Sequence, residues 1–534
     1  MNEEKTALLS VYNKDGIVEF AEVLTKHGYE ILSSGGTAKV LNEAGIKTTD
    51  VKDLTGTPPI LSHRVVTLAE EIHGALLAEK NNEHDSDRAT HNIPWIDLVC
   101  VDLYPLKEEI TKSDATAESV IEKTDIGGPT MLRSAAKGGR IVVADSSDRA
   151  RVIEWLEKGK PNEDEFRAML RAKAEYVVSE YVLHSARYHG PYDGIIGERV
   201  QECSYGENPW QKNAYLYSTH SGDPLALDAF THTEGATPSF NNWIDVGRLL
   251  QTATHIGAGF EKNYGSVPPI AIGVKHGNAC GVAVHKKPLV AVERMIESDT
   301  QAIFGGVVLI NFPLTKDIAT ALRKHKTEHP RGLDVVVAPE ITDEAYEVLG
   351  RKNGKCRFLV NPALAGKGLG EASIDTNIRY RFERGAFLTQ DNYTFVLDLS
   401  DSDIEWSGEF NEKQKRDVLL AWAIGSTSNS NTTTLVKDGM LLGNGTGQQA
   451  RHFSCEVAIR RARTHGHEIS GAVAYSDSFF PFTDGPEMLV EAGITSIFAS
   501  SGSVGDKKVI AKVQELGAHI ALIPDKKARG FFGH

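Results

Sequence analysis

The sequence predicts an α/β protein whose N-terminal part is a doubly wound parallel sheet. Short apolar runs alternate with amphipathic segments through the first half, and glycines end the amphipathic segments. This alternation is typical of parallel strands joined by crossover helices, with ligands bound beyond the carboxyl ends of the strands. A chain of 534 residues is also too long for one hydrophobic core, so two or three domains are expected.

The first elements follow from the spacing of their apolar residues. A continuous apolar run begins the chain's first strand, and the next segment places Ile17, Phe20 and Leu24 on one stripe of a helix that Gly28 ends. A second strand leads into a Ser-Gly-Gly-Thr turn and a second helix. The predicted elements are a strand at 6–11, a helix at 16–27, a strand at 29–32, a helix at 38–44 and a strand at 96–101.

Two glycine turns suit the binding of a phosphate. In the Ser-Gly-Gly-Thr turn, glycines between a strand end and a helix start expose backbone N–H groups, and the helix dipole adds positive charge. A tight turn with Thr37 as the helix cap explains the same residues equally well. A second glycine turn spans 125–133. With Arg64, Arg133 and Lys137 as cations, the two turns indicate one phosphorylated ligand.

The charge balance is acidic, with 58 basic and 72 acidic residues and a formal net charge of −14. This balance argues against nonspecific binding to nucleic acid or anionic membranes, although a cationic cleft can still hold a phosphate. The five cysteines form no C-x-x-C pair, and neither an apolar leader nor a membrane-spanning run is evident. We therefore expect a cytoplasmic protein with reduced thiols, no metal site, and no nucleic-acid or membrane partner.

Changes in composition divide the chain into three parts. The segment from about residue 161 is strongly helical and is typical of a bridging helix pair. Beyond Gly197 the chain has its own alternating elements and glycine clusters, and no internal repeat is evident. The predicted organisation is a first domain at 1–160, a helical linker at 161–195 and a second domain at 196–534.

The second region contains two candidate sites. Residues 275–281, Lys-His-Gly-Asn-Ala-Cys-Gly, place a proton acceptor beside a cation, and small residues there let backbone approach a ligand closely. Taken alone, a Lys-His pair is more often two surface residues. The Phe-Phe-Pro-Phe run at 479–482 lies between Asp477 and Asp484 and suits a slot for a flat heterocycle, although a hydrophobic corner of the core is the more frequent meaning.

An ordered set of motifs connects these segments to a known family. The motifs are Ser-Gly-Gly-Thr-Ala-Lys, Ile-His-Gly, Leu-Tyr-Pro, Asp-Ile-Gly-Gly-Pro-Thr-Met-Leu-Arg, Tyr-Gly-Glu-Asn-Pro, Lys-His-x-Asn-x-Cys-Gly, Phe-Gly-Gly, Gly-x-Gly-x-Gly-Gln-Gln-x-Arg and Ser-Asp-x-Phe-Phe-Pro-Phe-x-Asp. Each is weak alone, but their order is specific. Over essentially its whole length the chain resembles the bifunctional purine biosynthesis enzymes that join 5-aminoimidazole-4-carboxamide ribonucleotide (AICAR) transformylase to inosine monophosphate (IMP) cyclohydrolase.

The resemblance implies a fold, a reaction and an assembly. The first domain is expected to be methylglyoxal-synthase-like, and the second to contain cytidine-deaminase-like α/β subdomains. The second domain would transfer a formyl group from the co-substrate 10-formyltetrahydrofolate to AICAR, and the first would close formyl-AICAR to IMP. The family implies a homodimer with transformylase sites across the subunit interface, and no catalytic metal; a monovalent cation is left open. The zinc-deaminase alternative lacks its H-x-E and P-C-x-x-C motifs.

The resemblance also implies roles for individual residues of the transformylase domain. His276 matches the base, Lys275 the neighbouring catalytic lysine, and Asn431 the amide that holds the formyl oxygen. Four further residues match nucleotide-binding positions, namely Tyr205, Asn241, Arg451 and Arg529. The folate positions are Phe304, Phe479, Pro481 and Asp484.

In the first domain the resemblance implies a separate site. Its catalytic residues are Tyr104, Asp125 and Lys137. Its nucleotide-binding residues are Ser10, Lys14, Ser34, Gly35, Gly36, Thr37 and Arg64.

Several positions depart from the family pattern. Ser204 replaces an arginine and Trp210 a histidine, and loss of that arginine would weaken AICAR binding by roughly 1.5–3 kcal/mol. Val66 replaces a lysine and Asp102 an asparagine in the first domain, and Gly277 and Ala279 replace Ala and Pro in the second. The first-domain changes predict that the cyclohydrolase activity is reduced or differently organised, whereas the transformylase is expected to stay active. An enzyme with transformylase activity alone and a noncatalytic nucleotide sensor are the alternatives.

Overall fold

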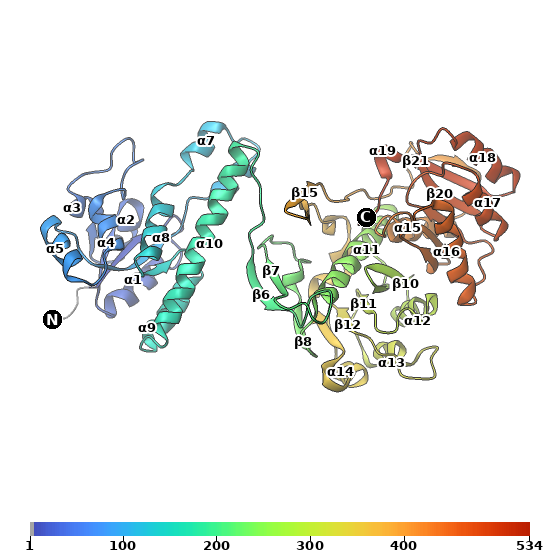
Figure 1. Ribbon diagram of the computed structural model, residues 1–534, viewed down its shortest axis with the longest axis horizontal. Coiled ribbons are helices and arrows are strands. Elements are labelled where there is room, and N and C mark those ends of the chain that lie inside the picture. Colours follow the sequence, from blue (N-terminus) through green and yellow to red (C-terminus); the bar gives the residue numbers. More distant parts are fainter. Residues whose placement is uncertain (1–4, 534) are drawn as a thin grey trace. The chain divides into compact units, whose positions relative to one another are not determined.

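The computed structural model describes residues 5–533, which fold into two compact units, Met1–Ile196 and Gly197–His534. Figure 1 labels many of the helices and some of the strands. The first unit is built on a sheet of five parallel strands in the order β3-β2-β1-β4-β5. The strands are β1 Lys5–Ser10, β2 Tyr29–Ser33, β3 Thr48–Asp50, β4 Ile96–Val101 and β5 Ile141–Val143. The prediction of a doubly wound parallel sheet is confirmed, and the strand order reverses between β1 and β4.

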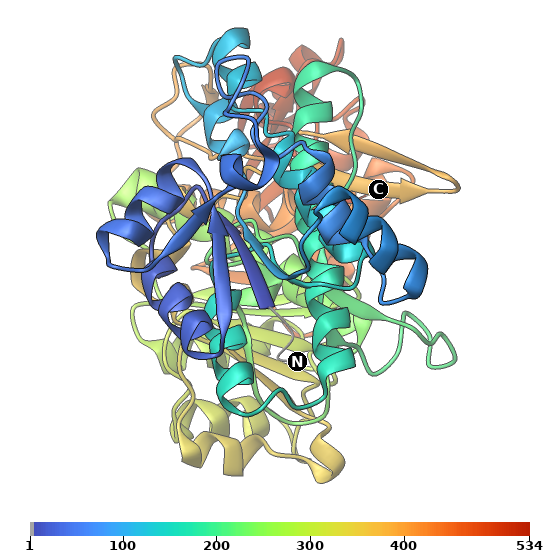
Figure 2. The same cartoon turned by 90° about the vertical axis from the view of Figure 1, so that its left-hand side faces the viewer.

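Helices cover both faces of this sheet (Figure 2). Side chains alternate across a strand, so Leu8 of β1 belongs to one buried cluster and its neighbour Leu9 to the other. The helices are α1 Ile17–Lys26, α2 Gly35–Glu43, α3 Val51–Thr55, α4 Glu70–Leu77, α5 Asn82–His91, α6 Leu106–Thr111, α7 Ala117–Glu122, α8 Gly127–Lys137, α9 Asp148–Glu157 and α10 Glu163–His189.

Helix α10 corrects the predicted linker. The segment at 161–195 contains one helix of 27 residues rather than a helix pair. Leu170 packs into one core cluster of the first unit, and Ala174 and Val178 pack into the other. The helix is therefore part of the first unit, because its apolar stripe closes that unit's core, and the chain passes to the second unit between Ile196 and Gly197.

The second unit is built on one sheet of twelve strands, in the order β16-β21-β20-β19-β17-β18-β10-β9-β11-β12-β13-β8. These strands are β8 Thr231–Glu234, β9 Ile270–Lys275, β10 Asn278–Val284, β11 Val307–Ile310, β12 Val335–Ala338, β13 Arg357–Val360, β16 Glu405–Ser407, β17 Thr433–Lys437, β18 Met440–Gly445, β19 Val473–Ser476, β20 Ser496–Ser501 and β21 His519–Pro524. Two hairpins lie apart from it, β6 Glu198–Glu202 with β7 Tyr215–Ser218, and β14 Arg379–Glu383 with β15 Ala386–Gln390.

The helices of the second unit are α11 Phe240–Tyr264, α12 Pro288–Ser298, α13 Lys316–Lys324, α14 Asp343–Leu349, α15 Glu412–Gly425, α16 Arg451–Thr464, α17 Asp484–Glu491, α18 Asp506–Glu515 and α19 Asp525–Ala528. Five short 3₁₀ helices complete the described segments, η1 Leu227–Ala229, η2 Lys352–Gly354, η3 Pro362–Leu364, η4 Gly366–Leu369 and η5 Glu371–Ser373. Across residues 5–533, no helix combines the length and apolar character needed to cross a bilayer.

The twelve-stranded sheet is an internal duplication. Each half runs through the chain as a strand, a helix, a hairpin, and then three helix–strand pairs. From each outer edge inward the order is also the same, since β8-β13-β12-β11-β9-β10 matches β16-β21-β20-β19-β17-β18. The two halves meet at the antiparallel contact of Ala283 with Met440. No internal repeat is evident in the sequence, because buried strands require apolar residues in the right places but not the same residues.

Candidate functional site

The larger of two cavities described in the second unit is a cleft of about 960 Å³. Of the predicted site residues, five line it, namely Tyr205, Asn241, Lys275, His276 and Phe304. They come from the loop after β6, the start of α11, the β9–β10 turn and the loop before β11. The fold thus brings the predicted base, its lysine and two predicted nucleotide contacts into one concave site.

The β9–β10 turn presents His276 to this cleft. Lys275 pairs with Asn278, and the two residues between them have positive φ, 52° at His276 and 72° at Gly277. Positive φ at both central positions defines a type I′ hairpin turn. Glycine is favoured at these positions, and histidine is uncommon there. In the sequence, only the neighbouring lysine, histidine and glycine indicated this site. The positive φ of the turn explains why glycine follows the histidine.

Asp245 and Arg248, which lie one helical turn apart on α11, fix the β9–β10 hairpin turn. Asp245 Oδ1 accepts a hydrogen bond from the Gly277 N–H at 2.8 Å, and Arg248 Nε donates to the Gly277 carbonyl at 2.7 Å. Burial raises the pKa of Asp245, and the Gly277 N–H together with His276 and Arg248 opposes that shift. Both polar groups of Gly277 are therefore engaged, which fixes the backbone that carries His276.

Lys275 connects the turn to the loop before β11. Its Nζ donates to the carbonyl oxygen of Phe304 at 2.8 Å, and the Phe304 ring is 55% exposed. An ammonium group has three N–H donors, so two remain for a ligand. The predicted catalytic lysine and a predicted folate contact are thus in direct contact.

Asn431 and Arg451 form a second cluster, outside the residues that line the cleft. Arg451 Nη2 donates to Asn431 Oδ1 at 2.6 Å, while its Nη1 donates to Ser476 Oγ at 2.7 Å and to Asp477. The Asn431 amide nitrogen donates to the Gln448 carbonyl at 2.8 Å. Asn431 is therefore oriented by protein partners on both ends of its amide.

The remaining predicted residues of the second unit also lie in its second half, in helices and loops rather than in the strands. Arg529 Nη1 is 3.6 Å from Asp525 Oδ2, and Asp484 begins α17 with Oδ2 3.8 Å from His452 Nδ1. Phe479 is half-buried and Pro481 is exposed. The Phe-Phe-Pro-Phe run is mixed, because Phe480 is buried in the core while Phe482 is 70% exposed. None of these residues lines the cleft.

In the first unit, predicted residues gather at the carboxyl ends of β1 and β2. Lys14 Nζ donates to the carbonyls of Val11 and, at 3.1 Å, Tyr12, and a Cβ on Gly36 would lie 3.8 Å from Lys14 Cε. Thr37 Oγ1 donates to the Val11 carbonyl at 3.1 Å.

The helix begins at Gly35 with Ser34 as its N-cap residue, so the interpretation of Thr37 as the cap was wrong. Ser10, the last residue of β1, is half-buried beside this turn.

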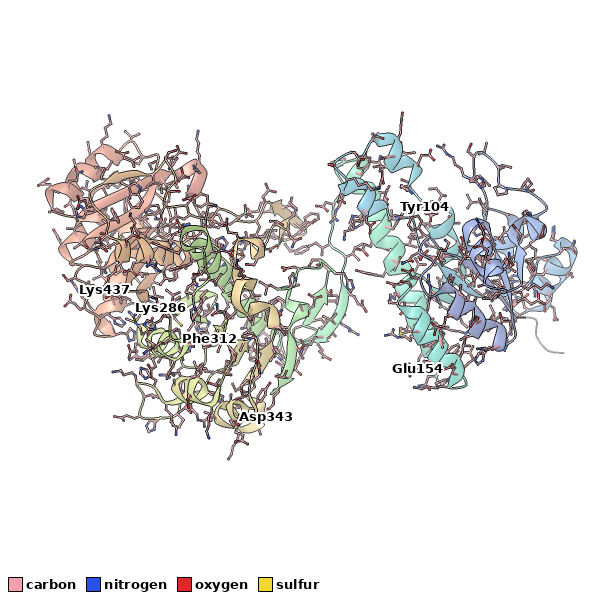
Figure 3. The ribbon with its side chains drawn as sticks, turned by 180° about the vertical axis from the view of Figure 1, so that it is seen from behind. Tyr104, Glu154, Lys286, Phe312, Asp343 and Lys437 are labelled. Atoms are coloured by element: carbon pink, nitrogen blue, oxygen red, sulfur yellow. The ribbon has the colours of Figure 1, made fainter. Side chains whose placement is uncertain are left out.

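Tyr104 and Asp125 lie near each other beyond β4, and Figure 3 labels Tyr104. Asp125 Oδ1 accepts from the Gly128 N–H at 2.8 Å, and burial raises the pKa of Asp125. Burial also raises the pKa of Tyr104, with further contributions from Asp125 and Tyr12. The rings of Tyr12 and Tyr104 meet edge to face at 5.7 Å. The Asp125 carboxylate thus occupies an N–H group of the second glycine turn, so not all N–H groups of that turn are free to bind a ligand.

Two predicted cations of the first unit lie elsewhere. Lys137 ends α8, ten residues after Gly127, so the helix rise alone separates it from the Asp125 end by about 15 Å. Arg64 forms an exposed ion pair with Glu122. The structure therefore does not group Lys137 with Asp125, because one helix spans the distance between them.

Asp102 departs from the family pattern, but its contacts could not be predicted from the sequence. Its carboxylate accepts from the backbone N–H groups of Tyr12 and, at 3.2 Å, Asn13, and it pairs with Arg149 at 3.2 Å. Arg149 is 4% exposed. This carboxylate lies where the strand order reverses, which is the usual ligand position of such sheets.

The sequence also missed several residues that line the cleft, namely Asp245, Arg248, Asp375, Arg379, Asn429 and Phe532. The spacing of Asp245 and Arg248 on one helix was the only signal available for them. The others come from a hairpin, a loop and the C-terminal segment, and only folding brings them together.

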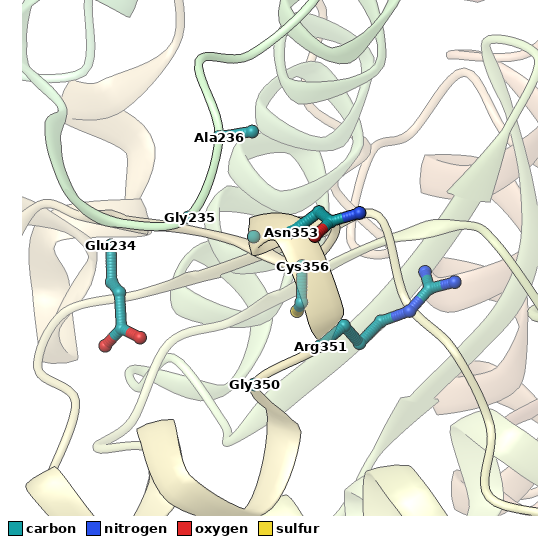
Figure 4. A pocket seen from close by; sticks show the side chains of 8 residues that line it. Glu234, Gly235, Ala236, Gly350, Arg351, Asn353 and Cys356 are labelled. Carbon is teal, nitrogen blue, oxygen red and sulfur yellow. The ribbon is translucent and has the colours of Figure 1, made fainter.

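A second hollow of about 620 Å³ lies beside β8 and is drawn in Figure 4. Its lining is Glu234, Gly235, Ala236, Gly350, Arg351, Asn353, Gly354 and Cys356. Glu234 and Arg351 project to opposite sides in this view. It contains none of the predicted site residues, and in the described part of the chain no three His, Cys, Asp or Glu side chains cluster as a metal site.

Comparison with known families places each unit. A profile of the MGS-like domain matches residues 16–130, which makes the first unit a member of that class of α/β domain. A profile described as the AICARFT/IMPCHase bienzyme matches residues 135–461, more than half of the chain. The chain belongs to the AICARFT/IMPCHase bienzyme family, and the expected fold of the two parts is confirmed.

Full-length relatives agree with this assignment. Three proteins named bifunctional purine biosynthesis protein PurH are similar to the chain. That of Anoxybacillus flavithermus is 35% identical over 97% of this chain and 98% of its own. Those of Bacillus cytotoxicus and Neisseria meningitidis are 35% and 34% identical over 96% and 97% of this chain, and 97% and 98% of their own. A solved structure titled "Crystal structure of ForH" matches 35% of this chain and 100% of its own at 32% identity, with a TM-score of 0.32.

Proposed function

We propose that this protein transfers a formyl group from 10-formyltetrahydrofolate to AICAR and closes the product to IMP. Family membership supports both activities. The observation that carries formyl transfer is the clamped turn, which holds His276 and Lys275 in a cleft lined also by Tyr205 and Asn241. A cleft of about 960 Å³ is of the size that small-molecule sites have.

In the proposed formyl transfer, His276 and Lys275 each have a role. The AICAR amine is a weak nucleophile, because its lone pair is delocalised into the ring. Attack on the formyl carbon therefore needs a base for the amine proton and a positive group beside the developing oxyanion. His276 takes the proton, and Lys275 stabilises the oxyanion. Collapse breaks the bond between the formyl carbon and N10, and tetrahydrofolate leaves with a proton.

A homodimer is part of this proposal. Asn431, Arg451 and Asp484 do not line the cleft that His276 faces, and the resemblance expects a shared site. Exposed aromatic rings at Phe453 and Phe482, 49% and 70% exposed, lie next to those residues in the sequence and suit an interface. The cytoplasmic location and a structurally bound monovalent cation rest on the resemblance alone.

For ring closure, the site is the strand end that carries Tyr104 and Asp125. Val66 supplies no cation there, but the Lys123 ammonium lies 5.9 Å from the centre of the Tyr104 ring and 5.5 Å from that of Tyr12. We infer that Lys123 provides the positive charge that stabilises developing negative charge as water leaves. The cyclohydrolase is thereby retained despite Val66.

The decisive experiment follows both products at once. Purified protein is incubated with AICAR and 10-formyltetrahydrofolate, tetrahydrofolate is followed spectroscopically, and formyl-AICAR and IMP are separated by chromatography. Prompt IMP formation supports both activities. Accumulating formyl-AICAR would restrict the proposal to formyl transfer, and nucleotide binding without folate turnover would favour a sensor instead.

A further inference from the structure

Two arginines converge on one aromatic ring in the cleft. Arg248 of α11 is 9% exposed, and its guanidinium carbon lies 4.6 Å from the centre of the Phe532 ring. Arg379 of β14 lies 3.7 Å from the same centre. All three residues line the cleft with His276. Two positive charges therefore share a small, partly buried volume next to the proposed base.

Within residues 5–533, neither arginine forms an ion pair, although Asp245 attracts Arg248 without direct contact. Arg248 donates only to neutral oxygens, the carbonyls of Gly277 and Phe532 and, at 2.7 Å, Asn429 Oδ1. Among residues 5–533, neither Arg248 nor Arg379 has a carboxylate oxygen within 4.0 Å. Burial and, to a smaller extent, the charge of Arg379 lower the pKa of Arg248 to about 10, and the Asp245 carboxylate opposes this shift. A buried charge without a counter-ion is costly.

Three of the four carboxylates that line the cleft have other partners, and Glu207 is the fourth. Asp245 accepts from the Gly277 N–H, and Asp334 lies 3.5 Å from Arg351. Asp375 accepts from Asn377 and Asn392, at 2.8 and 2.9 Å between side-chain atoms. None of these three carboxylates forms an ion pair with Arg248 or Arg379, so an anionic ligand would give the two guanidinium groups the direct partner that they lack.

The arginines predicted for the nucleotide are, by contrast, already paired. Arg451 is bound to Asp477, and Arg529 lies 3.6 Å from Asp525. Ser204, which stands where the resembling family has an arginine, offers no charge. The sequence therefore lacks one expected cation, and the structure supplies two unexpected ones in the cleft that the next residue, Tyr205, lines.

We propose that Arg248 and Arg379 form the subsite for the phosphate group of the nucleotide substrate. This inference rests on the proposed function and names which residues recognise its substrate. Planar guanidinium groups bind phosphate oxygens with paired hydrogen bonds, and two of them match a dianion. A folate carboxylate shares this chemistry. The phosphate is favoured because it carries more charge and because Tyr205 and Asn241 line the same cleft.

Arg379→Met is the test variant, because Arg379, unlike Arg248, does not hold the Gly277 turn. Calorimetry compares the affinity for AICAR with that for its nucleoside, which lacks the phosphate. We expect AICAR binding to weaken about ten- to a hundredfold, the equivalent of one lost charge-assisted contact, and nucleoside binding to change less than about twofold. Arg379→Lys, which keeps the charge, should lose less.

Arg381→Met is the matched control, because Arg381 lies on the same strand and pairs with Glu383 at 2.7 Å. It should leave AICAR affinity within about twofold of the parent. Equal loss of AICAR and nucleoside in Arg379→Met would overturn the subsite. Weakened binding of 10-formyltetrahydrofolate with unchanged AICAR affinity would also overturn it, in favour of a folate carboxylate. If the parent protein itself does not bind AICAR, the proposed function fails first.

Discussion

Asp245 and Asp417 hold equivalent turns in the two halves of the duplicated sheet. Asp245 of α11 accepts from the Gly277 N–H at 2.8 Å, and Asp417 of α15 accepts from the Gly439 N–H at 2.6 Å. The second turn has the same positive φ pair, 53° at Asp438 and 75° at Gly439. The first central position of the turn is histidine, the proposed base, in one half and aspartate in the other.

The lysine before each turn is equivalent as well. Lys275 Nζ donates to the Phe304 carbonyl at 2.8 Å, and Lys437 Nζ, whose residue is labelled in Figure 3, donates to the Ser470 carbonyl at 2.7 Å. In both halves the acceptor lies in the loop before the next strand of the sheet. The duplication therefore supplies matched controls for substitutions at the β9–β10 turn.

Substituting the proposed base should abolish most formyl transfer. His276→Gln keeps the turn but cannot accept the amine proton, so we expect the transfer rate to fall by about 10²- to 10⁴-fold. Asp438→Asn at the equivalent position of the other half should leave the rate unchanged. Tetrahydrofolate release under saturating substrates measures both. A His276→Gln enzyme that keeps more than half of its rate would remove His276 from the mechanism.

The two turn glycines should separate stability from activity. Gly277→Ala forces alanine into the left-handed region at a cost of about 1–2 kcal/mol and disturbs the backbone that carries His276. Gly439→Ala adds a clash, because its Cβ would lie 2.9 Å from the Val284 carbonyl oxygen. We expect Gly439→Ala to lower the free energy of unfolding more, and Gly277→Ala to lower the transfer rate more. Chemical denaturation and steady-state kinetics test this, and the reverse ranking would contradict it.

Asp417 should give the protein a pH-dependent stability. Burial raises the pKa of Asp417 to about 6, above the value of about 3.9 expected for the unfolded chain. Between these two values the folded state binds more protons than the unfolded state, so stability falls as pH rises from about 4 to 6 and is lower above that range. The contribution is at most about 3 kcal/mol.

Asp417→Asn removes this titration. The free energy of unfolding of the variant, measured by urea denaturation, should decline less than that of the parent between pH 4 and 6. Parallel curves for the two proteins would show that Asp417 ionises normally.

Lys123 and Lys137 should differ in their effect on ring closure. Lys123→Met removes the ammonium near Tyr104, so formyl-AICAR should accumulate while formyl transfer continues. Lys137→Met, at the far end of α8, should leave both rates within about twofold of the parent, as surface substitutions usually do. Chromatography of the products from formyl-AICAR distinguishes them. Slower closure in Lys137→Met alone would return that lysine to the mechanism.

Much of the fold of the first unit was predictable, because the alternation of apolar runs and amphipathic segments depends on local periodicity. The strand at 6–11 and the helix at 16–27 were observed as Lys5–Ser10 and Ile17–Lys26. The helical character of 161–195 was also evident, but neither its single helix nor that helix's place in the core was. A helical stripe shows that a face is buried, and only packing shows against which partner.

The candidate site was likewise predictable only in part. The sequence by itself indicated Lys275 and His276 as candidate site residues, since a proton acceptor and a cation beside glycine are residue types that a local pattern reveals. The tertiary structure alone decided that Arg248 and Phe532, 284 positions apart, meet beside them, and that two halves without visible sequence repetition share one topology. Local spacing encodes secondary structure and motif, whereas a cleft is made by long-range packing of segments whose separation in the sequence carries no signal.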